Sequence, residues 1–492
     1  MPLRVLAPLL LIFGLTIRSA PAAFVCPHLD DDAGRAMDGW KVPGLALGVV
    51  QADKVIAVRT YGEREAGTGQ PVTASTLFAV GSITKSLTSL GFSAISLRGD
   101  ISLDSPVRWQ LPSFPDGITF RHLLSHTSGW PRHDALWYLD AYGMTGIARR
   151  LALLPRFAPP GAAFQYNNVT YAAAGRALEN ISGASWHDWI YDVILEPAGM
   201  KSSVTTLSAF RTNENRARGY FPADTGRIPM ALRNTDPVAP AAGLYAHLND
   251  MLRYLQLLTN GGVVGDRRVV QAAAVQALFA AAADAPNRRY GLGLNLSDWR
   301  GRALAYHPGV VDGFGARISL LPGLSAGVIV LSNMSGPTPT AQIVSQTVLD
   351  CLVGYPRVDW VAAFGNVRPP PKPKPPPPPA AELNPPLAQF AGTYLHPAYG
   401  SMTFVPNVDG TGLTGRFHTR IFSLGYVGNA TWRVQETAWP LRDGLLISFA
   451  DPQPHGFASL ATPLADGPVY RHNAGPLEFR RGPLPSPRQT PL

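Results

Sequence analysis

Gly81-Ser82-Ile83-Thr84-Lys85 opens an apolar run whose pattern predicts a helix. Residues three apart on a helix share a face, so the side chains of Ser82 and Lys85 are expected to touch. A serine hydroxyl becomes a useful nucleophile when a neighbouring base takes its proton, and a desolvated lysine can be that base. Taken alone, the same spacing fits a serine that caps a helix and a lysine exposed one turn later, which is the commoner arrangement.

A second polar cluster, Tyr166-Asn167-Asn168, precedes a helical pattern over Tyr171–Asn180. A tyrosine beside a lysine can share a proton network with it, and an amide can orient both the lysine and a substrate. The alternative is an Asx-rich turn that caps the following helix.

The third cluster is His307-Pro308-Gly309-Val310. Backbone amides alternate sides along a strand, and proline cannot donate to a neighbour, so the side shared by 308 and 310 is predicted to be an open edge. The Val310 amide is then available beside the Ser82 amide to stabilise an oxyanion. His307 is expected to bring a polarisable or cationic group to the lip of the same cleft, and the alternative is a surface histidine at a turn.

The wider pattern predicts an α+β fold. Strand-like runs lie at Leu45–Val50 and Val55–Tyr61, and again much later at Ile318–Leu321 and Ala326–Leu331. Helical patterns lie between and after them, at Tyr171–Asn180, Trp186–Leu195, Leu244–Thr259 and Ala341–Leu352. This order predicts one antiparallel sheet that receives both ends of a domain spanning 24–360, flanked by helices, with a helical subdomain inserted.

A proline-rich segment, 367–386, separates a second region from the first. Proline fixes φ and removes the amide donor, so this segment is expected to be a semi-rigid linker. Short β-like stretches follow within 387–482, separated by turn residues, and they predict a small sandwich or barrel: Ser401–Val405, Thr431–Val434, Leu445–Phe449 and Val469–Tyr470. Residues 483–492 are expected to be a disordered tail.

In this order, the three clusters resemble the S-x-x-K, Y-x-N and K/H-x-G motifs of class C β-lactamases, penicillin-binding proteins, DD-peptidases, D-aminopeptidases and family VIII-type esterases. Arg121–Gly129 resembles the HLL-HTSG turn of the same superfamily, and the similarity covers 40–352. The resemblance implies an antiparallel sheet flanked by helices with an all-helical subdomain. Phe390–Tyr394 and Pro397–Gly400 resemble the small lipocalin-like β domain that follows many such hydrolases.

The resemblance also implies a role for each motif residue. Ser82 is acylated, Lys85 accepts its proton, and Tyr166 passes the proton to the leaving group and later helps activate water. Asn168 positions the substrate, and the amides of Ser82 and Val310 stabilise the oxyanion. No cofactor and no metal are implied.

These motifs predict a serine hydrolase that forms an acyl-enzyme, acting on peptide or amide bonds in D-residue-containing or cell-wall-like peptides. The alternatives are a carboxylesterase, a weak β-lactamase, or a penicillin or peptidoglycan sensor without turnover. His307 stands where β-lactamases carry a lysine, and Pro308 replaces a threonine whose hydroxyl helps to hold a substrate carboxylate. The expected partner is a small peptide, amide or ester substrate.

The N-terminus predicts export. Residues 1–22 combine a basic start at Arg4, an apolar run over Val5–Ile17 and the cleavage pattern Ala20-Pro21-Ala22. We expect a bacterial periplasmic or secreted protein without a stable membrane anchor, because no later run approaches the ~20 apolar residues of a span. The net charge of +9 is scattered rather than clustered, so no nucleic-acid partner is expected.

Two cysteines and two histidines have alternative interpretations. Cys26 and Cys351 are either unrelated thiols or one disulfide in an oxidising compartment, and the resemblance favours the bridge because the superfamily fold brings the first and last helices together. His122 and His126 have a helical metal-ligand spacing. No glutamate completes an H-E-x-x-H arrangement, which favours a structural role for both histidines.

Overall fold

A computed structural model describes residues 24–138, 141–223, 226–285, 288–336, 338–365, 386–435, 446–453, 456–462 and 477–482. The predicted signal peptide, all of the predicted linker except Pro386, the tail and the strand expected at Val469–Tyr470 lie outside the described residues. Within these ranges, no helix combines the length and hydropathy needed to cross a membrane.

A nine-stranded antiparallel sheet forms the centre of the large domain, in the order β10-β11-β12-β13-β14-β15-β1-β2-β3. Its strands are β1 Gly44–Gln51, β2 Lys54–Glu65, β3 Gln70–Pro71, β10 Ala283–Ala285, β11 Arg288–Tyr290, β12 Asn295–Trp299, β13 Arg302–Val311, β14 Phe314–Leu321 and β15 Ala326–Ser332. Early strand β1 pairs with late strand β15, Gly48 lying opposite Ile329. The prediction that one sheet receives both ends of the domain is therefore confirmed.

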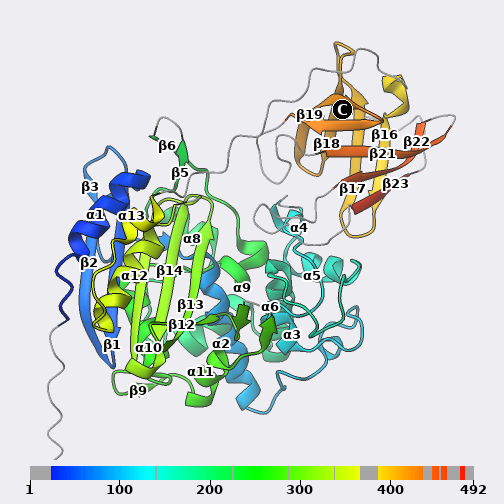
Figure 1. Cartoon of the computed structure of the whole chain (residues 1–492). Coiled ribbons are helices and arrows are strands. Elements are labelled where there is room, and N and C mark those ends of the chain that lie inside the picture. The colour runs from blue at the N-terminus through cyan, green and yellow to red at the C-terminus, as the bar shows by residue number, and fades with distance from the viewer. Residues whose placement is uncertain are drawn as a thin grey trace, which may run out of the picture.

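Alternating side chains give the sheet two apolar faces. Leu45, Leu47 and Val49 of β1 face one cluster, while Ala46 and Val50 face the other. The first face is covered by helices from both ends of the domain, α1 Leu29–Trp40, α12 Thr340–Leu352 and α13 Trp360–Phe364 (Figure 1). This face is where the N-terminal and C-terminal parts of the domain meet.

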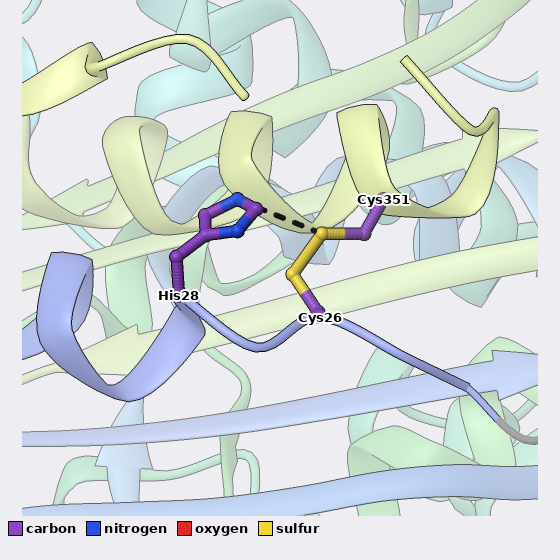
Figure 2. A group of neighbouring side chains, drawn as sticks. All are labelled: Cys26, His28 and Cys351. Atoms are coloured by element: carbon purple, nitrogen blue, oxygen red, sulfur yellow. Dashed lines mark hydrogen bonds between the residues drawn. A yellow bond between two sulfur atoms is a disulfide. The ribbon is translucent and has the colours of Figure 1, made fainter. Parts of the chain in front are cut away.

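A disulfide joins Cys26, just before α1, to Cys351 in α12, with their Cα atoms 5.5 Å apart. Figure 2 shows His28 beside this bridge, its Nε2 lying 3.8 Å from the Cys351 sulfur. Two cysteines and a histidine at this spacing could hold a metal ion only as free thiolates. Both sulfurs are instead used by the bridge, so the cluster acts as a cross-link.

Helix α10 packs on the second face of the sheet against β1 and β15, and the remaining helices belong to the same apolar cluster. Gly48 lets α10 lie close to β1, because a Cβ there would be 2.5 Å from a methyl of Leu252. The helices are α2 Thr84–Leu97, α3 Phe120–Leu124, α4 Ala135–Tyr138, α5 Met144–Ala152, α6 Asn168–Ser182, α7 Trp186–Ile190, α8 Leu207–Thr212, α9 Ala239–Ala242, α10 Leu248–Thr259 and α11 Ala272–Phe279. Single turns and a π-helical turn accompany these helices, η1 Gly81–Ile83, η2 Val107–Trp109, η3 Tyr191–Leu195 and η4 Asp236–Val238, while η5 Pro322–Leu324 connects β14 to β15.

Two helix boundaries differ from the sequence-based expectation. The helix expected over Leu244–Thr259 begins only at Leu248, because Tyr245–Ala246 form strand β7, which pairs with β4 (Phe78–Ala79). The helix expected over Trp186–Leu195 is α-helical only to Ile190 and continues as a π-helical turn. Further short pairs are β5 Tyr220–Ala223 with β6 Gly226–Pro229, and β8 Val263–Val264 with β9 Arg267–Arg268.

The C-terminal region is a closed eight-stranded barrel. Its strands follow η6 (Leu387–Gln389) and are β16 Gly392–His396, β17 Gly400–Pro406, β18 Leu413–Phe417, β19 Arg420–Gly428, β20 Thr431–Val434, β21 Leu446–Gln453, β22 Gly456–Thr462 and β23 Leu477–Arg481. Phe390, Tyr394 and Phe449 pack at its centre, with ring centroids 5.1 to 5.3 Å apart. Of the two all-β alternatives, the chain therefore forms the barrel.

Removing the disulfide should lower the free energy of unfolding by up to about 5 kcal/mol, because the cross-link closes a loop between residues 325 apart. The test is urea unfolding of the Cys26→Ala/Cys351→Ala double variant beside the oxidised wild type. Reduced wild type is the matched control and should unfold at the same urea concentration as the variant. An unchanged midpoint would contradict this contribution to stability.

Candidate active site

Ser82 lies in the turn η1. The backbone of this turn packs directly against the backbone of strand β13, because each segment has a glycine at the contact, Gly81 in η1 and Gly309 in β13. Gly81 has φ +55°, and a Cβ on it would lie 2.7 Å from the nitrogen of Val310. A Cβ on Gly309 would lie 2.0 Å from the carbonyl oxygen of Val80. Strand β13 is therefore held against η1, and the Val310 nitrogen lies next to the residue that precedes Ser82.

The Ser82 hydroxyl makes two side-chain hydrogen bonds. Lys85 Nζ lies 3.0 Å from Ser82 Oγ, and the Tyr166 hydroxyl donates to the same oxygen at 2.7 Å. Lys85 Nζ also lies 4.7 Å from the centroid of the Tyr166 ring. The expected one-turn contact between Ser82 and Lys85 is present, although Ser82 sits in a 3-10 turn and α2 begins only at Thr84.

Lys85 is completely buried and bonded to neutral oxygens. Its Nζ donates to Asn168 Oδ1 at 2.7 Å and to the carbonyl oxygen of Ala241 at 3.1 Å. These two bonds use both N–H groups of a free amine and leave its lone pair for the Ser82 hydroxyl. Burial holds the pKa of Lys85 well below its usual value, and the charge of Arg132 lowers it further, while Asp134 opposes the shift. These surroundings favour the free amine, which is the form able to accept a proton.

The Tyr166-Asn167-Asn168 cluster combines both interpretations of its sequence. Asn167 caps α6, its side-chain oxygen accepting from the amides of Val169 at 2.8 Å and Thr170 at 3.3 Å. The amide of Asn168 bridges Lys85 and Asp134, because its oxygen accepts from Lys85 and its nitrogen donates to Asp134 Oδ1 at 3.0 Å. The helix start thus fixes the orientation of the lysine.

Two charged residues at this site, the partly exposed Arg132 and the buried Asp134, were missed by the sequence analysis. Arg132 pairs with Asp134, and its guanidinium lies 5.5 Å from the centroid of the Tyr166 ring. Trp137 Nε1 also donates to Asp134 Oδ1, at 2.9 Å. The only available sequence signal was a pair of opposite charges just after the turn that resembles HTSG, and such pairs are usually exposed.

His307 is not a surface histidine at a turn, which was the alternative interpretation of its sequence. It lies within β13, and the strand alternation that exposes Val310 buries His307, leaving 2% of its surface accessible. Its Nδ1 lies 2.7 Å from the carbonyl oxygen of Pro308, and its ring centroid is 5.9 Å from that of Tyr166. The buried His307 ring therefore packs near the Tyr166 ring.

The pairing of β13 leaves its outer edge open where the sequence predicts it. Strand β12 pairs with β13 only as far as Asn295 opposite Tyr306, so among the described residues 307–311 pair on one side, with β14. Val310 is 58% exposed on this stretch. The backbone next to Ser82 is thus accessible from outside the sheet.

His122 and His126 do not share a helix face, because α3 ends at Leu124. The backbone amide of Thr119 donates to Nδ1 of His122 at 3.1 Å, completing the capping box of α3. The backbone amide of Asn167 donates to Nδ1 of His126, also at 3.1 Å. Both histidines therefore hold backbone around the site.

Residues 29–350 match the protein family described as Beta-lactamase. The chain belongs to this family. It is 27% identical over 432 residues to unguisins hydrolase ungD' of Aspergillus campestris, covering 75% of this chain and 76% of that protein. It is 27% identical over 325 residues to a D-aminopeptidase of Cereibacter sphaeroides, covering 62% and 60% of the two chains. These hydrolase-named relatives support assignment of the chain as a hydrolase.

A solved structure extends the likeness of fold to nearly the whole chain. The octameric penicillin-binding protein homologue from Pyrococcus abyssi superposes with a TM-score of 0.61 at 22% sequence identity, covering 92% of this chain and 99% of that one. The β-lactamase-like fold predicted from the motifs, with a small β domain after it, is confirmed.

Charge changes at Arg132 and Asp134 should move the pKa of Lys85 in opposite directions. Arg132→Gln removes a positive neighbour and should raise that pKa, whereas Asp134→Asn removes a negative one and should lower it further. The measurement is a pH titration of lysine ¹³Cε shifts, which is practical because lysine is scarce in this chain. Shifts of the same sign in both variants, with unchanged folding by circular dichroism, would contradict this electrostatic account.

Proposed function

We propose that the chain is an exported serine hydrolase that works through an acyl-enzyme on Ser82. The observation that carries this proposal is the pair of hydrogen-bond contacts that Ser82 Oγ makes, with a buried lysine and with a tyrosine. A serine hydroxyl needs a nearby base, and a lysine whose pKa is depressed by burial can act as one at moderate pH.

In the proposed reaction, Lys85 accepts the Ser82 proton as Ser82 Oγ attacks the substrate carbonyl. The resulting oxyanion is stabilised by the amides of Ser82 and Val310, which the close packing of η1 and β13 brings together. Tyr166 gives its hydroxyl proton to the leaving group and is reprotonated from Lys85, which returns to the free amine as the acyl-enzyme forms. A water molecule then hydrolyses the acyl-enzyme. Asn168 keeps the lysine aimed at the serine throughout.

The proposed substrates are peptides or amides, including those with D-residues. This choice is supported by relatives named as an unguisins hydrolase and a D-aminopeptidase. Pro308 offers neither a hydroxyl nor an amide to a penicillin carboxylate, so β-lactam hydrolysis should be weak. Export is supported by the signal-like sequence of residues 1–22 and by the Cys26–Cys351 disulfide, which suits an oxidising compartment.

Ser82→Ala should abolish turnover, and Tyr166→Phe should reduce it by about 100-fold or more, the usual contribution of proton transfer. The assay panel is a D-Ala-D-Ala peptide, a D-aminoacyl anilide, p-nitrophenyl butyrate and nitrocefin, with intact-protein mass spectrometry to detect the acyl group. Ser93→Ala is the matched control, because Ser93 lies in α2 and its buried hydroxyl has no hydrogen-bond partner among the described residues.

Each outcome of the panel has a distinct meaning. Fastest turnover of the peptide or anilide supports the proposed substrate class, whereas fastest turnover of the butyrate would make the chain an esterase. A stable acyl group without turnover would indicate a sensor. Activity that survives in Ser82→Ala would overturn the assignment of the nucleophile.

A further inference from the structure

The C-terminal barrel contacts the large domain close to the proposed active site. In Figure 1 the barrel lies beside α4 and α5. The contact is made mainly by the turn between β16 and β17, and His418 in the turn between β18 and β19 adds a contact with Tyr142. Tyr399 in the first of these turns is completely buried, and its hydroxyl lies 2.9 Å from Nδ1 of His133. His133 is also buried, with 1% of its surface exposed.

Hydrogen bonds within the barrel fix the conformation of the turn between β16 and β17. Nδ1 of His396 accepts hydrogen bonds from the amides of Ala398 at 3.0 Å and Tyr399 at 3.2 Å. Nε2 of His418 lies 2.7 Å from the carbonyl oxygen of Tyr399. Gly400 closes the turn at φ +81°, a conformation that favours glycine.

The large domain binds the backbone of the same turn. Arg150 donates to the carbonyl oxygen of Ala398 at 3.0 Å, and its guanidinium stacks 3.7 Å from the centroid of the Tyr142 ring. The Tyr142 hydroxyl donates to the carbonyl oxygen of Tyr399 at 3.3 Å. The position of the Tyr399 side chain is therefore fixed from both domains.

A short chain of contacts leads from Tyr399 to the proposed catalytic lysine. His133 directly precedes Asp134, whose carboxylate accepts from the Asn168 amide at 3.0 Å. The oxygen of the same amide accepts from Lys85 Nζ at 2.7 Å, and Lys85 contacts Ser82. Any displacement of His133 would move the backbone of Asp134 and thus the amide that orients the lysine.

We propose that Tyr399 of the barrel is a positioning residue for the proposed hydrolase, holding His133 so that Asp134 and Asn168 keep Lys85 aimed at Ser82. The barrel thereby forms part of the active-site support. This inference rests on the proposed function. The contact is between uncharged groups, because burial, and then the charge of His396, lower the pKa of His133 to about 3. Its effect is therefore on geometry.

The test is Tyr399→Phe in the full-length protein, which removes one hydroxyl and keeps the ring. If the hydroxyl positions the lysine, kcat per active site should fall about tenfold with KM unchanged, as expected for one lost hydrogen bond. Active sites are counted by the acylation burst, so a loss of folded protein does not count as a loss of rate. Tyr394→Phe is the matched control, because Tyr394 is equally buried and its hydroxyl donates to Phe390 within the barrel.

A double-mutant cycle with His133→Phe tests whether the contact itself carries the effect. The double variant should be no slower than the slower single variant, because both substitutions break the same hydrogen bond. Effects of the two substitutions that multiply would overturn the proposed route through His133. Unchanged kcat in Tyr399→Phe would overturn the positioning role.

Hydrogen exchange provides a readout that does not depend on activity. Amides of 130–138 should exchange about tenfold faster in Tyr399→Phe than in wild type or Tyr394→Phe, reflecting one lost hydrogen bond. If no substrate is turned over but this exchange rises, the proposed function fails while the support of the loop by Tyr399 stands. Unchanged exchange overturns that support whether or not the chain is an enzyme.

Discussion

The burial of one amine, that of Lys85, determines the arrangement of the whole site. An ammonium group removed from water needs hydrogen-bond acceptors and favours its neutral form. Lys85 has three neutral oxygens around it, from Ser82, Asn168 and Ala241, which come from separate segments of the chain. Helices α6 and α9, which carry Asn168 and Ala241, must therefore pack against α2 for the lysine to occupy this position.

Asn168 separates the lysine from the nearest carboxylate. If Asp134 contacted Lys85 directly, an ion pair would stabilise the ammonium form and raise the pKa of the lysine. The Asn168 amide lies between them, and Arg132 balances the charge of Asp134. The carboxylate can thus fix the orientation of the amide while its effect on the pKa of Lys85 is outweighed by burial and by Arg132.

Sequence periodicity predicted the parts of the site that local geometry determines. The one-turn spacing of Ser82 and Lys85, and the open edge next to Pro308, follow from the geometry of a single helix or strand. The burial of His307 could not be predicted, because strand alternation decides which side chains face inward, and the phase of that alternation depends on what covers the sheet. The late start of α10 has a similar cause, since Tyr245 pairs with a strand distant in sequence.

Arg132, Asp134 and Tyr399 could not be assigned from sequence because their surroundings come from tertiary contacts. Tyrosine is common in turns, and nothing local distinguishes an exposed ring from one buried between domains. The hydroxyl of Tyr399 is informative only once its burial is known. If this residue only held the two domains together by apolar packing, a phenylalanine would do so equally well. Burying a hydroxyl costs free energy unless the hydroxyl forms a hydrogen bond. Tyr399 is bonded to His133 through its hydroxyl, and its backbone carbonyl is bonded from both domains. These directional bonds therefore fix one orientation of the barrel on the large domain, which apolar packing alone would not do.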